Sequence, residues 1–404
     1  MRRDGRRASG RPWQMCWGRG WAVNALIYAV PRSLGFDPFV SLEITNAVVC
    51  GIGFIATYLV ARRLLGVSVL LALFAAMAAL LANSLTIRSM HAQLLYAAFF
   101  PVGILLVWPL FMALTRSGGR SPRGAGPVLL ALATIALFYV WAMTSFYSLF
   151  AFALFMTFAL AAAILLDRPL QSRVWTAVRR PPPALIVLAI GLAVAAVAVF
   201  ALYSQSGHGG HSVSSMKAGT RPFVELFNVG GSNWIWGRLM PPLMNLLSAG
   251  GNPNDPYGLS PVFLLTFVAS LAWLLWLVGR RRRISAGRMS GDVDRATFAC
   301  ALGIAAVVLG LFAFRIGPVP LFQPVFVLVP GASAIRLPVR FLLFIVPVVA
   351  LVTACALDLF ARRGRVSAVA VAALALFILV EQGHGESAFR LDRHEEQAFL
   401  DGIG

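Results

Sequence analysis

The sequence predicts an all-α integral membrane protein with about ten transmembrane helices. Composition favours this class: 59% of the 404 residues are hydrophobic, and only 12% are charged, against ~25% in a typical soluble domain. The pattern favours it too, because long apolar segments alternate with short, arginine-rich loops. Since a helix of about 20 apolar residues crosses the hydrocarbon core of a bilayer, we interpret each such segment as a span.

Residues 1–36 are predicted to form a basic N-terminal segment ahead of the spans. Residues 1–20 are rich in arginine and glycine, show no periodicity and lack the apolar core of a signal peptide. Trp21–Tyr28 is apolar but too short to span. We therefore expect an interfacial helix here, ended by Pro31.

Residues 37–383 are predicted to form one polytopic membrane domain. Its fourth and fifth spans belong to a single apolar run of about forty residues, twice the length that a bilayer requires. We divide this run at Thr144 and Ser145, where the apolar sequence is interrupted. The predicted spans are Val40–Ala61, Gly66–Leu85, Gln93–Leu114, Pro127–Met143, Phe146–Leu166, Ala184–Tyr203, Leu259–Gly279, Ala296–Phe314, Val339–Phe360 and Val366–Glu381.

Arginine predicts the orientation of these spans. The loops after the first, third, fifth, seventh and ninth spans are rich in arginine, so they should face the cytoplasm. The alternate loops should be extracytoplasmic, and they include the long loop 204–258 and the loop 315–338. Residues 384–404 should form a short extracytoplasmic tail.

The net charge of +19 is explained by the same loops. Because the arginines lie between apolar segments, we expect a lipid bilayer as the partner and no nucleic acid. Lys217 is the only lysine, which is typical of a GC-rich bacterial genome. We therefore expect a multi-pass protein of the bacterial plasma (inner) membrane.

Basic residues at two predicted outer boundaries are candidates for binding an anion. Arg88, His91 and Gln93 lie between the second and third spans, and Arg336 and Arg340 lie four residues apart at the start of the ninth. A guanidinium or an imidazole at a helix mouth suits a phosphate or pyrophosphate group. The alternative is that these arginines are interfacial anchors that reach lipid phosphates.

Two carboxylates are candidates for acid–base chemistry. Glu43 lies about one turn inside the first span, where an acid either has a function or reaches back to water. Glu225 lies in the long outer loop. Asp37, just before the first span, is interpreted as a turn or helix cap.

The long outer loop also contains candidates for binding a sugar. Trp234 and Trp236 offer flat apolar faces on which sugar rings stack, although an aromatic belt at the membrane boundary has the same composition. Arg221 lies in the same loop. His208 and His211 are too few for a zinc site, and the four cysteines lack metal-ligand spacing, so no metal or other cofactor is indicated.

Four stretches of the chain carry a resemblance to known proteins through their order and spacing. They are SLGFDPFVSLEITNAVVCGIGFIATYLVARRLLG, MHAQLLYAAFFPVGILL, TSFYSLF and VPGASAIRLPVRFLL. They resemble bacterial multi-pass membrane proteins of the GT-C glycosyltransferase type and of the YfhO type, over roughly Ser33 to Glu381. The resemblance implies a GT-C-like helical fold that transfers a sugar from a polyprenyl-phosphate donor to a glycan, lipid or protein acceptor on the extracytoplasmic face.

The resemblance also implies roles for the candidate residues. Arg88, His91, Arg336 and Arg340 would bind the lipid phosphate and stabilise the leaving group. Glu43 or Glu225 would deprotonate the acceptor hydroxyl.

The sequence departs from the resembled proteins at both ends. Those proteins have a further span and an acidic outer loop before the matching region, and they continue beyond the last span. We therefore expect a first span to be missing and the tail to be truncated.

Three other functions stay open. A transporter or flippase of a lipid-linked sugar would carry polar residues deep in several spans, and the mid-span regions here are almost free of them. An O-antigen ligase or polymerase would share the outer arginines and the long outer loop. A non-catalytic membrane protein is the third alternative.

Overall fold

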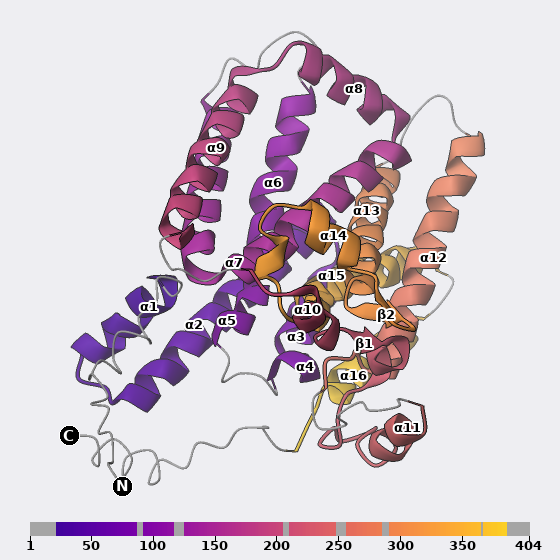
Figure 1. Cartoon of the computed structure of the whole chain (residues 1–404). Helices are drawn as coiled ribbons and strands as arrows, with labels where there is room; N and C mark the ends of the chain where they lie inside the picture. Colours follow the sequence, from indigo (N-terminus) through magenta and orange to yellow (C-terminus); the bar gives the residue numbers. More distant parts are fainter. Residues whose placement is uncertain are drawn as a thin grey trace, which may run out of the picture.

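The computed structural model describes residues 22–86, 92–116, 125–204, 210–247, 256–284, 291–364 and 367–385. These residues fold into a helical protein with one very small sheet (Figure 1). Seven helical segments in the described ranges are long and apolar enough to cross a membrane. The chain is therefore an all-α, multi-pass membrane protein. The seven segments are Pro38–Leu64, Tyr96–Thr115, Gly126–Leu166, Pro183–Ala201, Pro261–Arg280, Asp294–Leu311 and Pro338–Arg362.

Long helices account for most of the fold. They are α2 (Pro38–Leu59), α6 (Phe99–Arg116), α7 (Gly126–Leu166), α9 (Pro183–Ser204), α12 (Pro261–Ile284), α13 (Gly291–Leu311) and α15 (Phe341–Arg362). The shorter helices include α1 (Ala22–Ser33), α3 (Val69–Leu80), α4 (Asn83–Thr86), α5 (Ala92–Leu95), α8 (Arg168–Arg179), α10 (Val213–Ala218), α11 (Met240–Leu247), α14 (Gln323–Leu328) and α16 (Ala368–Glu381). A π-helical turn, η1 (Val60–Leu64), continues α2, and 3₁₀ turns include η2 (Tyr96–Ala98), η3 (Phe223–Phe227), η4 (Ala332–Ala334) and η5 (Pro338–Arg340).

The sheet joins two loops that are distant in sequence. Strand β1 (Arg221–Pro222) pairs in parallel with β2 (Phe314–Ile316), which pairs in antiparallel fashion with β3 (Val319–Pro320). The register places Arg221 opposite Phe314. These strands fix the long loop after α9 against the segment that follows α13.

Two predicted spans are shorter than expected. In the segment 66–85, α3 has only 12 residues and is followed by the separate turn α4, and α16 has 14 residues. Asn83 anchors the turn α4, since its side-chain amide donates to the carbonyl of Val229 at 2.6 Å. At α16 the hydroxyl of Ser367 accepts from the amide of Ala370 at 3.1 Å and starts the helix.

The long apolar run forms one helix, α7, with a break inside it. Ser145 has φ −156° and ψ 85°, which is extended backbone within 41 helical residues. This break coincides with the position where the sequence divides into the fourth and fifth predicted spans. The Ser148 hydroxyl near the break accepts a hydrogen bond of 2.7 Å from the Trp141 indole.

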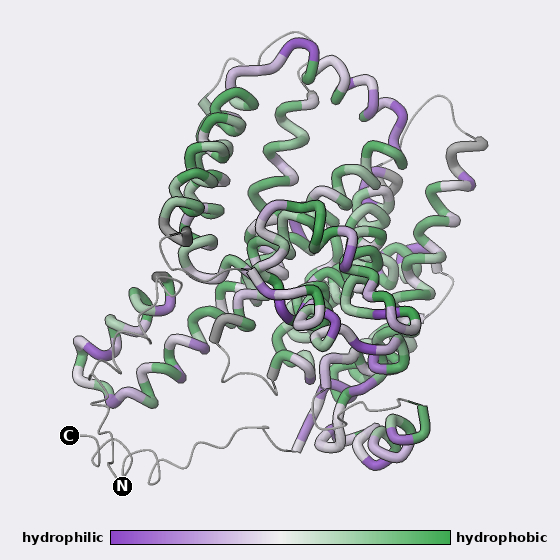
Figure 2. Tube along the Cα trace, in the orientation of Figure 1, coloured by the Kyte–Doolittle hydropathy of each residue, from purple (hydrophilic) through white to green (hydrophobic). Residues whose placement is uncertain are grey.

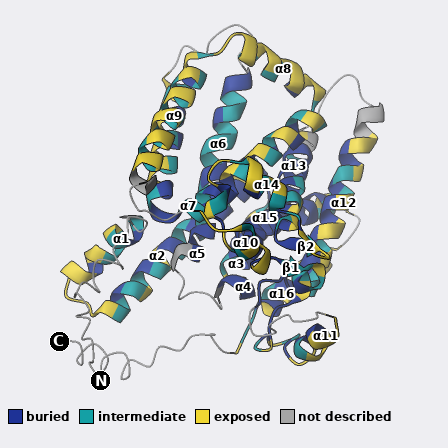
Figure 3. Cartoon of the chain, viewed as in Figure 1, coloured by how far each residue is buried: buried dark blue, intermediate teal, exposed yellow. Residues whose placement is uncertain are grey.

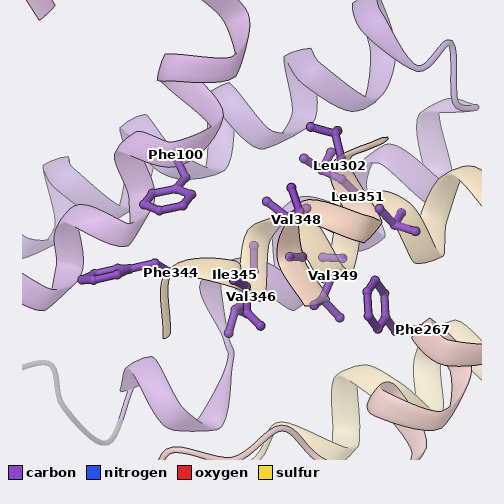
Figure 4. Close-up of a cluster of buried hydrophobic side chains, with 14 of the residues drawn as sticks. Phe100, Phe267, Leu302, Phe344, Ile345, Val346, Val348, Val349 and Leu351 are labelled. Atoms are coloured by element: carbon purple, nitrogen blue, oxygen red, sulfur yellow. The ribbon is translucent and has the colours of Figure 1, made fainter. Parts of the chain in front are cut away.

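Helix α15 is the centre of the core. Every residue from Phe341 to Leu359 is buried, whereas the other long helices each keep an exposed face (Figure 3). A helix that is apolar on all sides is stable only when other helices surround it. Phe344 stacks on Phe100 of α6 at 5.6 Å, and Val348, Val349 and neighbouring side chains fill the space towards α12 and α13 (Figure 4).

Helix α9 lies at the edge of the bundle, packed on α7. It is apolar along its length, yet much of it is exposed (Figures 2 and 3). Its exposed residues Ile186, Ile190, Val194 and Val197 follow helical spacing. This stripe is suited to contact with lipid chains.

Helix α1 extends further than predicted. It includes Pro31 and ends at Ser33, because Gly35, with φ 88°, closes it in a Schellman motif. In that motif the Phe36 amide donates to the Pro31 carbonyl at 3.2 Å. The prediction that Pro31 ends the helix is wrong by about half a turn, because the helix continues to Ser33. Proline is tolerated in this last turn, where it removes a single hydrogen bond, the one to the carbonyl four residues earlier.

The prediction that Asp37 is a helix cap is confirmed. One of its carboxylate oxygens accepts from the amides of Phe39 at 2.9 Å and Val40 at 3.1 Å, at the start of α2.

Loops gather at two opposite ends of the bundle. At the arginine-rich end, Arg362 donates to the carbonyl of Gly66 at 2.9 Å, and the guanidinium of Arg295 lies against Gly66. At the loop end, segments 210–247, 313–340 and 381–385 meet, for example through an Arg221 amide that donates to Ala313 at 3.0 Å.

Candidate functional site

The break at Ser145 positions the first part of the site. Just after it, the ring of Phe146 faces Gly331, whose φ of 83° is in the left-handed region and begins η4. The hydroxyl of Tyr147 donates to the backbone carbonyl of Leu337. The loop that precedes α15 is thereby fixed on the bent part of α7.

Arg340 follows directly in η5. Its guanidinium carbon lies 5.9 Å from the centre of the Tyr147 ring. Its Nε atom is buried and has no hydrogen-bond partner among the described residues. The arginine thus brings a buried cationic donor to the loop end.

Arg336 has a different environment and is exposed. The four-residue spacing does not place it on one helical turn with Arg340, because Leu337 has a non-helical backbone with φ −120° and ψ 76°. The predicted pair of arginines is therefore split between a partly buried position, Arg340, and an exposed one, Arg336.

Glu225 supplies a buried carboxylate at the same end. It lies in η3 and is 3% exposed. One carboxylate oxygen accepts a hydrogen bond of 2.7 Å from the side-chain amide of Asn228, while the other has no partner in the described part of the chain. An acid in this state has a free acceptor that faces the protein interior.

Tyr257 connects the surroundings of Glu225 and Arg340. The Gly258 amide donates to the carbonyl of Asn228 at 2.9 Å, so the segment that contains Tyr257 lies beside the segment that contains Glu225. Tyr257 is buried near Tyr147, and the ring of Tyr147 lies beside the guanidinium of Arg340. We define the loop-end site as Tyr147, Glu225, Asn228, Tyr257 and Arg340.

This arrangement has a clear chemical capacity. A buried donor or acceptor without a partner costs about 1–3 kcal/mol, and more when it is charged. A ligand that offers an anionic oxygen to Arg340 and a hydroxyl to Glu225 would recover that cost. The loop-end site is thus suited to holding an anion and accepting a proton.

The two tryptophans of the long loop are held against the end of α16. The indole of Trp236 donates to the carboxylate of Glu381 at 2.6 Å. The ring of Trp234 lies over Gly383, while 67% of this residue remains exposed. Of the two, Trp234 has the larger free surface. Arg221 is half-buried in β1.

From the sequence, Glu381 is predicted only to be the last residue of the tenth span. In the structure it is fully buried and accepts three hydrogen bonds, from Trp236 and from the amides of Val262 at 2.8 Å and Phe263 at 3.0 Å. It therefore caps the start of α12. The signal in the sequence that could have indicated this role is the position of the carboxylate at the end of an apolar run.

The remaining candidates lie elsewhere. Glu43 is exposed on α2, which packs against α1, α3 and α6, whereas Glu225 is in the loop. Gln93 lies in α5. Arg88 and His91 lie outside the described residues. Within the described ranges, no group of three or more histidine, cysteine or acidic side chains is placed to hold a metal ion.

Comparison with known proteins gives no relative for this arrangement. No family model, no curated protein and no solved structure matches the chain.

Proposed function

We propose that this protein is a membrane glycosyltransferase that transfers a sugar from a polyprenyl-phosphate donor to an acceptor hydroxyl at the loop end. The observation that carries the proposal is the pair of buried, unsatisfied groups of opposite charge: Nε of Arg340 and one carboxylate oxygen of Glu225. Arg340 lies beside the ring of Tyr147, and the segment that contains Glu225 and Asn228 is bonded to Gly258, next to Tyr257. The helices of the protein suit a bilayer.

The two groups have complementary roles in this reaction. The acceptor oxygen attacks the anomeric carbon, the bond from that carbon to the phosphate oxygen breaks, and polyprenyl phosphate leaves. Arg340 stabilises the negative charge on the departing phosphate, and Glu225 takes the proton of the acceptor hydroxyl. A bound phosphate also satisfies the buried Nε atom, which favours donor binding.

The surrounding candidates belong to the edges of this proposed site. Trp234 provides an exposed indole face for a sugar ring, and Arg221 and Arg336 add positive charge at the same end. The proposal includes the GT-C-like fold, the bacterial inner membrane and an extracytoplasmic location for the loop end, as the resemblance implies.

Transfer of a labelled sugar from synthetic polyprenyl-phosphate donors by the detergent-purified protein tests the proposal. We expect Glu225→Gln to lower kcat by about 10²-fold or more. Arg340→Gln should lower kcat/KM by about 10²-fold. Arg238→Gln is the matched control, because this arginine is exposed in the loop-end segment 210–247 and is not part of the proposed site.

Equal activity in Arg340→Gln and Arg238→Gln would refute the assignment of Arg340. No transfer by the wild type, together with movement of the lipid-linked sugar across proteoliposomes, would replace the transferase with a flippase.

A further inference from the structure

A cavity lies at the arginine-rich end of the molecule. Its volume is about 490 Å³, and α6, α7, α8, α13 and the π-helical turn η1 surround it. From Tyr147 to Asp167 at the mouth of this cavity, α7 rises by about 30 Å, so the cavity is separate from the loop-end site. Its polar lining consists of Arg63, Asp167, Arg173, Asp294, Arg295 and Thr297.

Thr297 is the first sign of a ligand. It is 8% exposed, and its hydroxyl is buried without a hydrogen-bond partner in the described ranges. Threonines in helices ordinarily donate to the carbonyl four residues earlier, as Thr45, Thr57 and Thr266 do here at 2.7 Å. A buried hydroxyl that lines a cavity and does not form this bond is available to a bound group.

Arg63 is the second sign. It lies in the π-helical turn, a rare conformation that is frequent at functional sites. No hydrogen bond or ion pair engages its side chain within the described structure. A free guanidinium thus faces the same cavity as the free hydroxyl of Thr297.

The other charged side chains fix the net charge of the lining. Asp167 pairs with Arg173 at 3.5 Å and caps α8 by accepting from the Leu170 amide at 3.3 Å. The Arg295 guanidinium is positioned across the backbone of Gly66, and Asp294 precedes it. Three guanidinium groups and two carboxylates leave one positive charge, which matches an anion of charge −1.

The apolar wall of the cavity and the adjoining helix α8 have the mixed apolar and basic composition of a membrane boundary. Trp108 and Phe298 stack at 4.0 Å and form an apolar wall. The adjoining α8 exposes Trp175 and Val178, and its Arg179 lies 4.7 Å above the Trp175 ring. In Figure 1, α8 runs across the end of the bundle between α7 and α9.

We propose that this cavity binds a phosphodiester monoanion, with Arg63 and Thr297 as its main recognition groups. A phosphodiester carries one negative charge at neutral pH and accepts hydrogen bonds from both side chains. Such a group occurs in phospholipid headgroups and in soluble glycerophosphodiesters, and the two sources are distinguished by experiment.

Binding to the detergent-purified full chain is measured by native mass spectrometry. The probes are dioleoyl-phosphatidylglycerol, its water-soluble headgroup sn-glycero-3-phosphoglycerol, and dioleoylglycerol, which lacks the phosphate. We expect Arg63→Gln and Thr297→Val each to weaken phosphodiester binding by about tenfold or more. Thr297→Ser should restore it, and Arg180→Gln, an exposed arginine outside the cavity, should leave it unchanged.

The outcomes separate as follows. Both positive outcomes require that the Arg63 and Thr297 variants lose phosphatidylglycerol binding while Arg180→Gln keeps it. If the wild type does not bind the soluble headgroup, the ligand is a lipid. If the wild type binds both probes with comparable affinity, the ligand is a soluble phosphodiester. Equal binding by the wild type and by the Arg63 and Thr297 variants, or equal binding of dioleoylglycerol, would overturn the proposal. If Thr297→Val does not fold, the comparison of Arg63→Gln with Arg180→Gln decides the matter.

Discussion

The indole N–H of Trp236 donates a hydrogen bond of 2.6 Å to the carboxylate of Glu381, a side chain with no exposed surface. The bond joins the long loop to the end of α16, more than a hundred residues further along the chain. Because the same carboxylate also accepts from the first amides of α12, three segments depend on one acid.

Removal of this carboxylate should destabilise the protein strongly. Glu381→Ala leaves three buried donors without an acceptor, so we expect a loss of roughly 3 kcal/mol or more. Glu381→Gln keeps one acceptor oxygen and should cost less, and Trp236→Phe, which removes one donor only, should cost about 1 kcal/mol. Thermal unfolding in detergent measures this order. Equal midpoints for Glu381→Ala and the wild type would contradict it.

Sequence and structure diverge most clearly at this acid. Hydrophobicity places the end of an apolar segment correctly at Glu381, but hydrophobicity carries no information about which distant donors meet a carboxylate there. The role of Trp236 was missed for the same reason, since a sugar-stacking platform and a buried donor have the same sequence. Asp37 was predictable because its cap is made by amides two and three residues ahead.

Span lengths show a second limit of prediction. The long apolar run and its interruption at Ser145 were readable from composition alone, and the backbone does break there. The shortness of α3 was not, because the separate turn α4 that follows it is anchored by the bond from Asn83 to Val229, a contact that depends on the fold. Likewise, the spacing of Arg336 and Arg340 suggested one helical face, while the intervening non-helical Leu337 separates them.

Tyr147→Phe should loosen the loop that holds Arg340. The substitution removes the hydrogen bond to Leu337 and keeps the ring that packs against Phe341 and Phe344. We expect a stability loss of about 1 kcal/mol and faster amide exchange in residues 329–340. Hydrogen exchange measured by mass spectrometry reports both. Tyr139→Phe, on an exposed part of the same helix, is the control and should leave the exchange unchanged.

Asp358→Ala should cost more stability than Arg362→Ala. Asp358 is buried and accepts both from the Ser68 amide at 2.9 Å and from Arg362 at 2.7 Å, whereas Arg362 is 47% exposed. Without the acid, the Ser68 amide at the start of α3 loses its acceptor, at a cost of about 1–3 kcal/mol. The exposed arginine should contribute about 0–1 kcal/mol. Denaturation of the two single variants tests the order, and a larger effect of Arg362→Ala would refute it.

Gly66→Ala tests how Arg295 is positioned at the cavity of the arginine-rich end, where we propose that a phosphodiester binds. Gly66 has φ 61°, so alanine costs roughly 1–2 kcal/mol from backbone strain alone. A methyl group there would also lie 2.4 Å from the guanidinium carbon of Arg295 and would push that side chain away. Gly364→Ala is the matched control, since its φ is 66° and no described atom lies within 4 Å of the added methyl. We expect both variants to lose stability in thermal unfolding, but only Gly66→Ala to weaken phosphatidylglycerol binding. Equal losses of binding in the two variants would show that strain, and not the contact with Arg295, accounts for the effect.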